Sequence, residues 1–186
     1  MSLKAPQIEG ALRRTGAVLA ARGIEGPIRL YLVGGSAGLL NGLIGAARMT
    51  ADVDVMSMEP GEKWEWVRDA ARTVAAELRL PETWLNDECR IFAWCLPLGW
   101  RGRCDRAIAA GPLEVRLISR GDFVAGRVVT AARRPADLED LLALKPTRGE
   151  LAFAEENVSR LEREHLGPEH GFDEARAILR VLRGER

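Results

Sequence analysis

The sequence predicts an α+β protein, in which a small mixed sheet is flanked by helices and followed by a helical C-terminal portion. Short apolar or alternating runs bounded by glycine and proline, such as residues 28–33 and 113–118, predict strands in the N-terminal two thirds of the chain. Longer segments with helical spacing lie between these runs. Beyond residue 118 only helical segments follow.

The composition argues against a membrane protein and against a protein whose overall charge attracts its partner. The chain has 186 residues, with 27 Lys and Arg against 27 Asp and Glu, so its formal net charge is zero and a charged partner must be recognised locally. No apolar stretch reaches the roughly 20 residues that a membrane helix needs. The first residues lack the apolar core of a signal peptide. We therefore expect a cytoplasmic protein that does not enter a membrane.

The first half of the chain predicts two longer helices, two strands and one short helix. Gly23 ends the first helix, a glycine pair ends the first strand, and Pro81 stops the second long helix. Ser36 is expected to cap the short helix. In chain order the elements are a helix over 8–21, a strand over 28–33, a helix over 36–44, a strand over 51–56 and a helix over 62–80.

The second half is less regular at first and then helical. We interpret the Trp84–Asp87 segment as a capped turn, while residues 91–96 fit either a helix or a strand. Gly111 and Pro112 separate two further strands. These strands cover 105–110 and 113–118, and helices starting near Ser119, Pro135, Thr147 and Phe172 reach 133, 144, 165 and 183. We predict a domain over 1–146 and a helical extension over 147–186 packed on it.

The cysteines and histidines do not have the spacing of a metal site, a redox motif or a catalytic triad. Cys89, Cys95 and Cys104 lack the CxxC spacing of zinc and redox sites, so we expect buried or half-buried free thiols. His165 and His170 are separated by a Gly-Pro break, which argues against a shared metal site and against a catalytic triad. Catalysis is left to carboxylates, hydroxyls, basic side chains and backbone groups.

A glycine corner follows the first strand. Gly34 and Gly35 lack a Cβ, so the backbone can turn sharply and approach a ligand. Ser36 and the N–H groups that open the next helix favour an anion such as phosphate. Taken alone, such a turn is commonly no more than a tight turn with a cap.

An Asp-x-Asp pair follows on the next strand. Asp52 and Asp54 stand two positions apart, so their side chains share one face, with Cα atoms roughly 7 Å apart. Such carboxylates can hold Mg²⁺ together with the oxygens of a nucleoside triphosphate. A metal held there would align an attacking hydroxyl and neutralise the leaving pyrophosphate. Taken alone, the pair is commonly a solvated strand face.

The order and spacing of these pieces resemble the active-site motif of the polymerase-beta-like nucleotidyltransferase superfamily. The chain is similar, over about residues 28–145, to a group of bacterial minimal nucleotidyltransferases related to the toxins of abortive-infection toxin–antitoxin systems. The residues that carry the resemblance are Leu32-Val33-Gly34-Gly35-Ser36, Arg48, Thr50, Asp52, Asp54, Trp84-Leu85-Asn86-Asp87 and Asp137-Leu138-Glu139-Asp140.

The resemblance implies roles for particular residues. It assigns triphosphate binding to Gly34, Gly35 and Ser36, and Mg²⁺ binding with catalysis to Asp52 and Asp54. Arg48 is expected to contact phosphate or to brace the aspartate strand. Relatives usually carry a lysine in the helix after the last strand, where this sequence has Gly126 and Arg127, so Arg127 is the expected substitute. For the usual third carboxylate the candidates are Glu114 and Asp105.

Two charged clusters have two interpretations each. Asp137, Glu139 and Asp140 either orient a basic group near the site or form a favourable acidic first turn of their helix. Arg101, Arg103 and Arg106, beside Trp100, form either an RNA-contacting patch or a solvated basic turn.

The sequence therefore predicts a nucleotidyltransferase that moves a nucleoside monophosphate from an NTP to an acceptor hydroxyl. The acceptor is an RNA 3′ end, a protein or a small molecule, and the resemblance implies a toxin with an antitoxin partner. One alternative is an inactive nucleotide- or partner-binding module with the same fold. The other is a structural subunit whose helical C-terminus forms the interaction surface.

Overall fold

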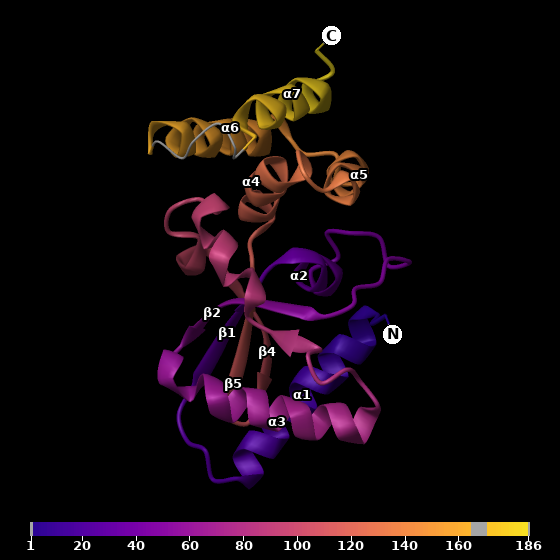
Figure 1. Cartoon of the computed structure of the whole chain (residues 1–186), viewed down its shortest axis with the longest axis vertical. Helices are drawn as coiled ribbons and strands as arrows, with labels where there is room; N and C mark the ends of the chain where they lie inside the picture. Colours follow the sequence, from indigo (N-terminus) through magenta and orange to yellow (C-terminus); the bar gives the residue numbers. More distant parts are fainter. Residues whose placement is uncertain (1, 165–170, 186) are drawn as a thin grey trace. The chain divides into compact units, whose positions relative to one another are not determined.

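The computed structural model describes residues 2–164 and 171–185, and it confirms the predicted α+β class (Figure 1). Contacts within the chain group it into two compact units. One unit comprises Met1–Ile91 with Arg101–Ile118, and the other comprises Phe92–Trp100 with Ser119–Arg186. The sequence-based division between residues 146 and 147 stays a prediction about folding domains.

The first unit contains a five-stranded mixed sheet, as predicted. The strand order is β3-β2-β1-β5-β4, with β1–β5 and β2–β3 parallel and β1–β2 and β4–β5 antiparallel. The elements of this unit are α1 (Ala5–Ala21), β1 (Ile28–Leu32), α2 (Gly34–Leu40), β2 (Val53–Glu59), α3 (Trp64–Leu78), β3 (Leu85–Asn86), β4 (Asp105–Ala110) and β5 (Leu113–Leu117).

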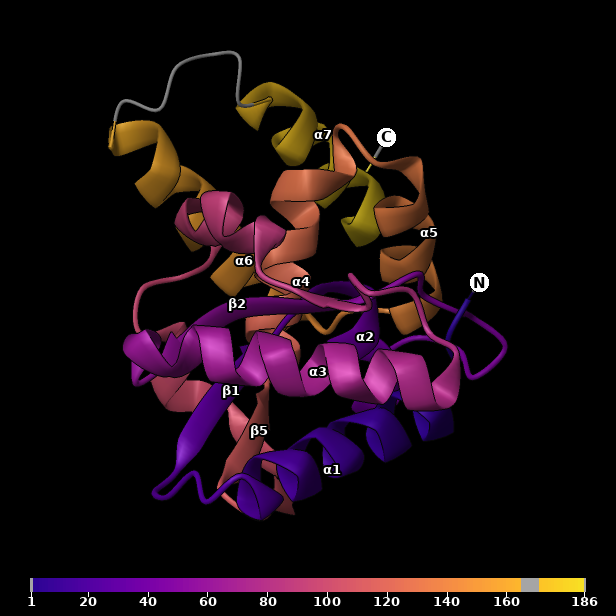
Figure 2. The same ribbon diagram turned by 60° about the horizontal axis from the view of Figure 1, so that its bottom comes forward.

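One face of this sheet forms the core of the unit. Alternation along the strands places fully buried side chains such as Leu30, Leu32 and Val115 on one side. Helices α1 and α3 pack against each other and cover that side (Figure 2). The approach of α1 to the β4–β5 hairpin is close, because a Cβ at Gly16 would lie 2.1 Å from the carbonyl oxygen of Ala110. The opposite face of the sheet carries charged side chains.

The second unit is built from helices whose starts the sequence encodes locally. The Ser119 hydroxyl caps α4 (Arg120–Ala131), and Thr147 forms a capping box with Glu150 at α6 (Arg148–Arg163). Helix α4 packs against α5 (Pro135–Leu144), α6 and α7 (Phe172–Arg183). The predicted starts are confirmed, while the predicted end at 165 and both histidines lie outside the described residues.

The structure differs from the sequence-based predictions between these regular elements. The predicted Ser36 cap is wrong, because α2 begins at Gly34 with Val33 as its N-cap residue, and the helix has seven residues. The predicted turn at Trp84–Asp87 contains the short strand β3, and Glu88–Cys95 is 3₁₀-helical rather than α-helical or extended. Strand β2 begins one residue after Asp52. No helix in the described part of the chain is long and apolar enough to span a bilayer.

Candidate functional site

The glycine corner and the aspartate pair meet at one edge of the sheet. Because β1 and β2 are antiparallel neighbours, the residues after the end of β1 lie beside those at the start of β2. Leu32 pairs with Val55, and the Val33 amide donates a hydrogen bond of 3.2 Å to the carbonyl oxygen of Asp54. The sheet topology therefore brings together residues that are about 20 positions apart in sequence.

Gly34 lies against the second aspartate of this pair. Its φ is +66°, a left-handed conformation that side-chain-bearing residues seldom adopt. A Cβ built at Gly34 would lie only 2.7 Å from Asp54 Oδ2. The Asp54 carboxylate thus points to the corner and lies against its backbone.

This geometry predicts a specific cost for Gly34→Ala. A Cβ there meets both the backbone strain and the Asp54 carboxylate, and we expect the free energy of unfolding to fall by about 2–4 kcal/mol. Gly42→Ala is the matched control, because Gly42 has a φ of +65° with nothing within 4 Å of its added Cβ. Urea-induced unfolding of both variants measures the difference. Equal losses would show that Asp54 does not crowd this position.

Thr50 braces the corner from the loop before β2. Its hydroxyl lies 3.4 Å from where a Cβ of Gly35 would be, and it donates a 3.1 Å hydrogen bond to the carbonyl oxygen of Asp52. The Ser36 side chain is fully buried, and its hydroxyl lies 3.3 Å from the carbonyl oxygen of Val33, to which it donates. Gly34 and Gly35 are only half-buried, so their backbone is the accessible part of the corner.

Asn86 positions the first aspartate. Its side-chain amide Nδ2 donates a 3.0 Å hydrogen bond to Asp52 Oδ2, while its Oδ1 accepts from the Glu88 amide. The β2–β3 pairing places Asn86 beside Asp54 in register. Asp52 and Asp54 are both half-buried. The resemblance included the segment that contains Asn86, but sequence analysis assigned this residue no role.

The negative charges at this end of the strands affect the pKa of the nearby Cys89 thiol. Burial raises the pKa of its thiol to about 12, and the negative charges of Asp54, Asp87 and Asp52 contribute to the rise. The thiol therefore stays protonated at neutral pH and is not a nucleophile. All three cysteines are free, and none is fully exposed, which confirms the sequence-based expectation.

The donor chemistry of the corner suits Mg²⁺ shared with a phosphate ligand. Magnesium prefers oxygen ligands and is commonly held by one or two carboxylates plus substrate phosphates and water. Asp52 and Asp54 supply two such carboxylates, and the absence of a Cβ at Gly34 lets the Asp54 carboxylate lie against the half-buried backbone of the corner. Within residues 2–164 and 171–185, no group of three or more His, Cys, Asp or Glu side chains is arranged to hold a metal ion alone.

The strand register places neither candidate third carboxylate beside Asp54. Glu114 pairs with Arg29 near the opposite end of β1, and Asp105 lies on β4, two strands away from β1. The residue that follows β5 beside the end of β1 is Ile118, whose amide donates to the carbonyl oxygen of Leu32. This neighbouring position is therefore apolar.

The two arginines predicted to bind nucleotide lie in different units. Arg48 is exposed on the loop between α2 and β2, in the sheet-bearing unit. Arg127 is buried in the helical unit, where its guanidinium forms ion pairs with Asp137 and Asp140. Asp137 and Asp140 of α5 thus hold a basic group of their own unit, and the orientation of a basic group near the site stays a prediction. Nucleotide binding by Arg48 and Arg127 stays a prediction.

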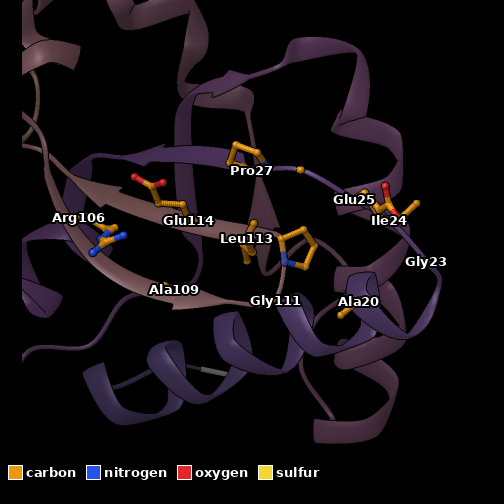
Figure 3. A pocket seen from close by; sticks show the side chains of 12 residues that line it. Ala20, Gly23, Ile24, Glu25, Pro27, Arg106, Ala109, Gly111, Leu113 and Glu114 are labelled. Carbon is orange, nitrogen blue, oxygen red and sulfur yellow. The ribbon is translucent and has the colours of Figure 1, made fainter.

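A surface pocket of about 630 Å³ lies at the other end of β1 (Figure 3). It is lined by the end of α1 and the loop that follows it, by β4 and β5, and by the turn between these two strands. Its charged side chains are Glu25, Arg106 and Glu114. None of the residues predicted to bind nucleotide or metal lines this pocket.

Comparison with known proteins gives no evidence about the function of the site. No protein-family model, no curated protein and no solved structure matches the chain. Because many unrelated functions share similar folds, function has to be argued from the geometry of the residues at the site.

Proposed function

We propose that the chain is a Mg²⁺-dependent nucleotidyltransferase of the cytoplasm, acting on an NTP and an acceptor hydroxyl. The observation that carries the proposal is the contact between the Asp54 carboxylate and the Gly34 backbone, with Asp52 held by Asn86, the residue that pairs in register with Asp54. This arrangement puts the Asp54 carboxylate against the half-buried backbone of the glycine corner. Mg²⁺ held by Asp52 and Asp54 would offset the charge of the triphosphate and of the leaving pyrophosphate.

In this reaction the acceptor oxygen forms a bond to the α-phosphorus while the bond from that phosphorus to the β-phosphate oxygen breaks. The acceptor hydroxyl loses its proton to solvent, and pyrophosphate leaves. The half-exposed backbone of Gly34 and Gly35 admits the phosphates closely. Asn86 holds the Asp52 carboxylate in one orientation, which reduces the reorganisation needed when the substrate binds.

The proposal also concerns the acceptor and the biological role of the chain. The acceptor is an RNA 3′ end, a protein or a small molecule, and the family resemblance favours a toxin that an antitoxin neutralises. Arg48, which is exposed on the loop before β2, is the cationic side chain that we propose for contact with the nucleotide.

A transfer assay tests the proposal. The purified chain is incubated with each NTP labelled at the α-phosphate, with Mg²⁺, and with total cell RNA or lysate protein. We expect label from at least one NTP to become acid-insoluble with Mg²⁺ and to remain soluble with EDTA. Heat-denatured chain is the control. No transfer with any NTP would contradict the proposal.

An inactive nucleotide-binding module is the second candidate. The apolar Ile118 at the end of β5 favours it, because this position beside the end of β1 supplies no further carboxylate. The same preparation distinguishes the two candidates. Saturable binding of a labelled NTP without any transfer to an acceptor would support the binding module.

A further inference from the structure

The sheet face opposite α1 and α3 carries a cluster of arginines. Strand register sets Arg29 of β1 beside Glu59 and Glu114, and Arg116 of β5 beside Tyr31. The cluster, which we call the arginine face, contains four arginines and two glutamates. Its charged members are Arg29, Arg101, Arg106, Arg116, Glu59 and Glu114. On a chain with zero net charge, this face has a local excess of two positive charges.

Most of the ion pairs on the arginine face are long. Arg29 lies 3.8 Å from Glu59 and 3.7 Å from Glu114, and the Arg101–Glu59 pair measures 3.5 Å. The side chains of Arg29 and Glu59 are each 40% exposed, so solvent screens their attraction. The Nε atoms of Arg29 and Arg116 have no hydrogen-bond partner among the described residues. These Nε atoms are buried, so a ligand would reach the terminal nitrogens of the half-exposed guanidinium groups, where the long ion pairs leave room for competition by phosphate.

Two arginines of this face lie directly opposite each other. Arg106 on β4 pairs in register with Arg116 on β5, and cross-strand partners share one side of a sheet. Like charges in this position destabilise the folded state. Arg106 is exposed, and a bound anion would reverse the repulsion. The arrangement favours anion binding over stability.

We propose that the arginine face binds the phosphate backbone of a single RNA strand and leads its 3′ end to Asp52 and Asp54. This inference rests on the proposed function, because it identifies the acceptor. From Arg29 to Gly34 the chain extends for five residues, about 16 Å, which matches about five stacked nucleotides. Arg106 and Glu114 also line the 630 Å³ pocket, so the face continues into a depression at its far end (Figure 3).

The polar groups among the arginines favour RNA over DNA. The Ser57 hydroxyl and the Glu59 carboxylate on β2 lie within 3.5 Å of the Arg101 guanidinium. Both oxygens can accept a hydrogen bond from a ribose 2′-hydroxyl, which deoxyribose lacks. Guanidinium groups at the same place suit phosphate geometry.

Fluorescence anisotropy tests the assignment directly. The probe is a 5′-labelled RNA of about a dozen nucleotides with a free 3′-hydroxyl, titrated in EDTA at several salt concentrations. We expect Arg106→Gln to weaken binding about five- to tenfold at low salt and to lower the salt slope by about 0.7, as for the loss of one phosphate contact. Its melting temperature should not fall, because the variant removes a like-charge pair.

Arg72→Gln is the matched control, because Arg72 is 51% exposed on α3, on the other side of the sheet. We expect its RNA affinity to equal that of the unmodified chain. Equal weakening by both substitutions, or no measurable RNA binding at low salt, overturns the proposal. Binding of a DNA of the same sequence with equal affinity, or equal displacement of the RNA by poly-glutamate, overturns the assignment to RNA.

Failure of the RNA-binding proposal can be distinguished from failure of the proposed nucleotidyltransferase function. Binding in EDTA needs neither Mg²⁺ nor catalysis, and Asp54→Asn should bind the RNA at least as tightly as the unmodified chain. RNA binding that depends on Arg106, without any nucleotide transfer, supports the arginine face and contradicts the proposed function. Nucleotide transfer without RNA binding supports the proposed function and contradicts RNA binding by the arginine face.

Discussion

Asp54→Asn is expected to lower Mg²⁺-dependent nucleotide transfer by about a thousandfold or more. The substitution keeps the size of the side chain but removes the charge that would hold the metal beside the Gly34 corner. A loss of about 4 kcal/mol of transition-state stabilisation corresponds to this factor. The measurement is the rate of incorporation of α-labelled nucleotide at saturating NTP and Mg²⁺.

The loss must reflect chemistry rather than unfolding. Asn has nearly the same shape as Asp, so the contact with Gly34 remains and the melting temperature should stay within a few degrees of that of the unmodified chain. Asp69→Asn is the matched control, because the Asp69 side chain is 68% exposed on α3, away from the corner. Its transfer rate should be unchanged. A folded Asp54→Asn variant with more than a tenth of the original rate would rule out metal binding by Asp54 as the basis of catalysis.

The elements that the sequence predicted well are those determined locally. Short runs bounded by glycine and proline predicted β1, β4 and β5, because such breaks end a strand within the chain itself. The starts of α4, α5 and α6 follow from Ser119, Pro135 and Thr147, whose capping or fixed φ acts within one turn. Such signals need no knowledge of the tertiary fold.

The start of α2 depends on tertiary structure and was predicted wrongly. Serine is a common N-cap residue, so Ser36 was expected at the boundary. Gly34 begins the helix instead, in a left-handed conformation packed against Asp54, which comes from another strand. The buried Ser36 side chain then serves the turn through Val33. A local propensity could not include a neighbour 20 residues away.

The candidate site was predicted only in part for the same reason. Spacing placed Asp52 and Asp54 two residues apart, but the contact with Gly34 depends on β1 and β2 being neighbours. Asn86 reaches Asp52 through the β2–β3 pairing, 34 positions along the chain. The strand order that creates both contacts is a property of the whole sheet, which periodicity does not reveal.

Arg127→Met is expected to lower the free energy of unfolding by about 3–5 kcal/mol, which makes it the largest effect on stability that we predict. The side chain of Arg127 is 9% exposed, and those of its partners Asp137 and Asp140 are 3% and 7% exposed. The Thr130 hydroxyl also donates to Asp137, at 2.6 Å. Removing the guanidinium leaves two carboxylates in a dry environment without their cation. Urea-induced unfolding followed by far-UV circular dichroism measures the loss.

Two further variants separate the loss of charge compensation from the loss of side-chain packing. Arg133→Met, at an exposed position just after the end of α4, should change stability by less than about 0.5 kcal/mol. Adding Asp137→Asn and Asp140→Asn to Arg127→Met should recover most of the lost stability, because no unpaired charge then remains and the amide oxygen introduced by Asp137→Asn can still accept from Thr130. If the triple variant were no more stable than Arg127→Met alone, the cluster would act through packing, and its charges would not matter to the fold.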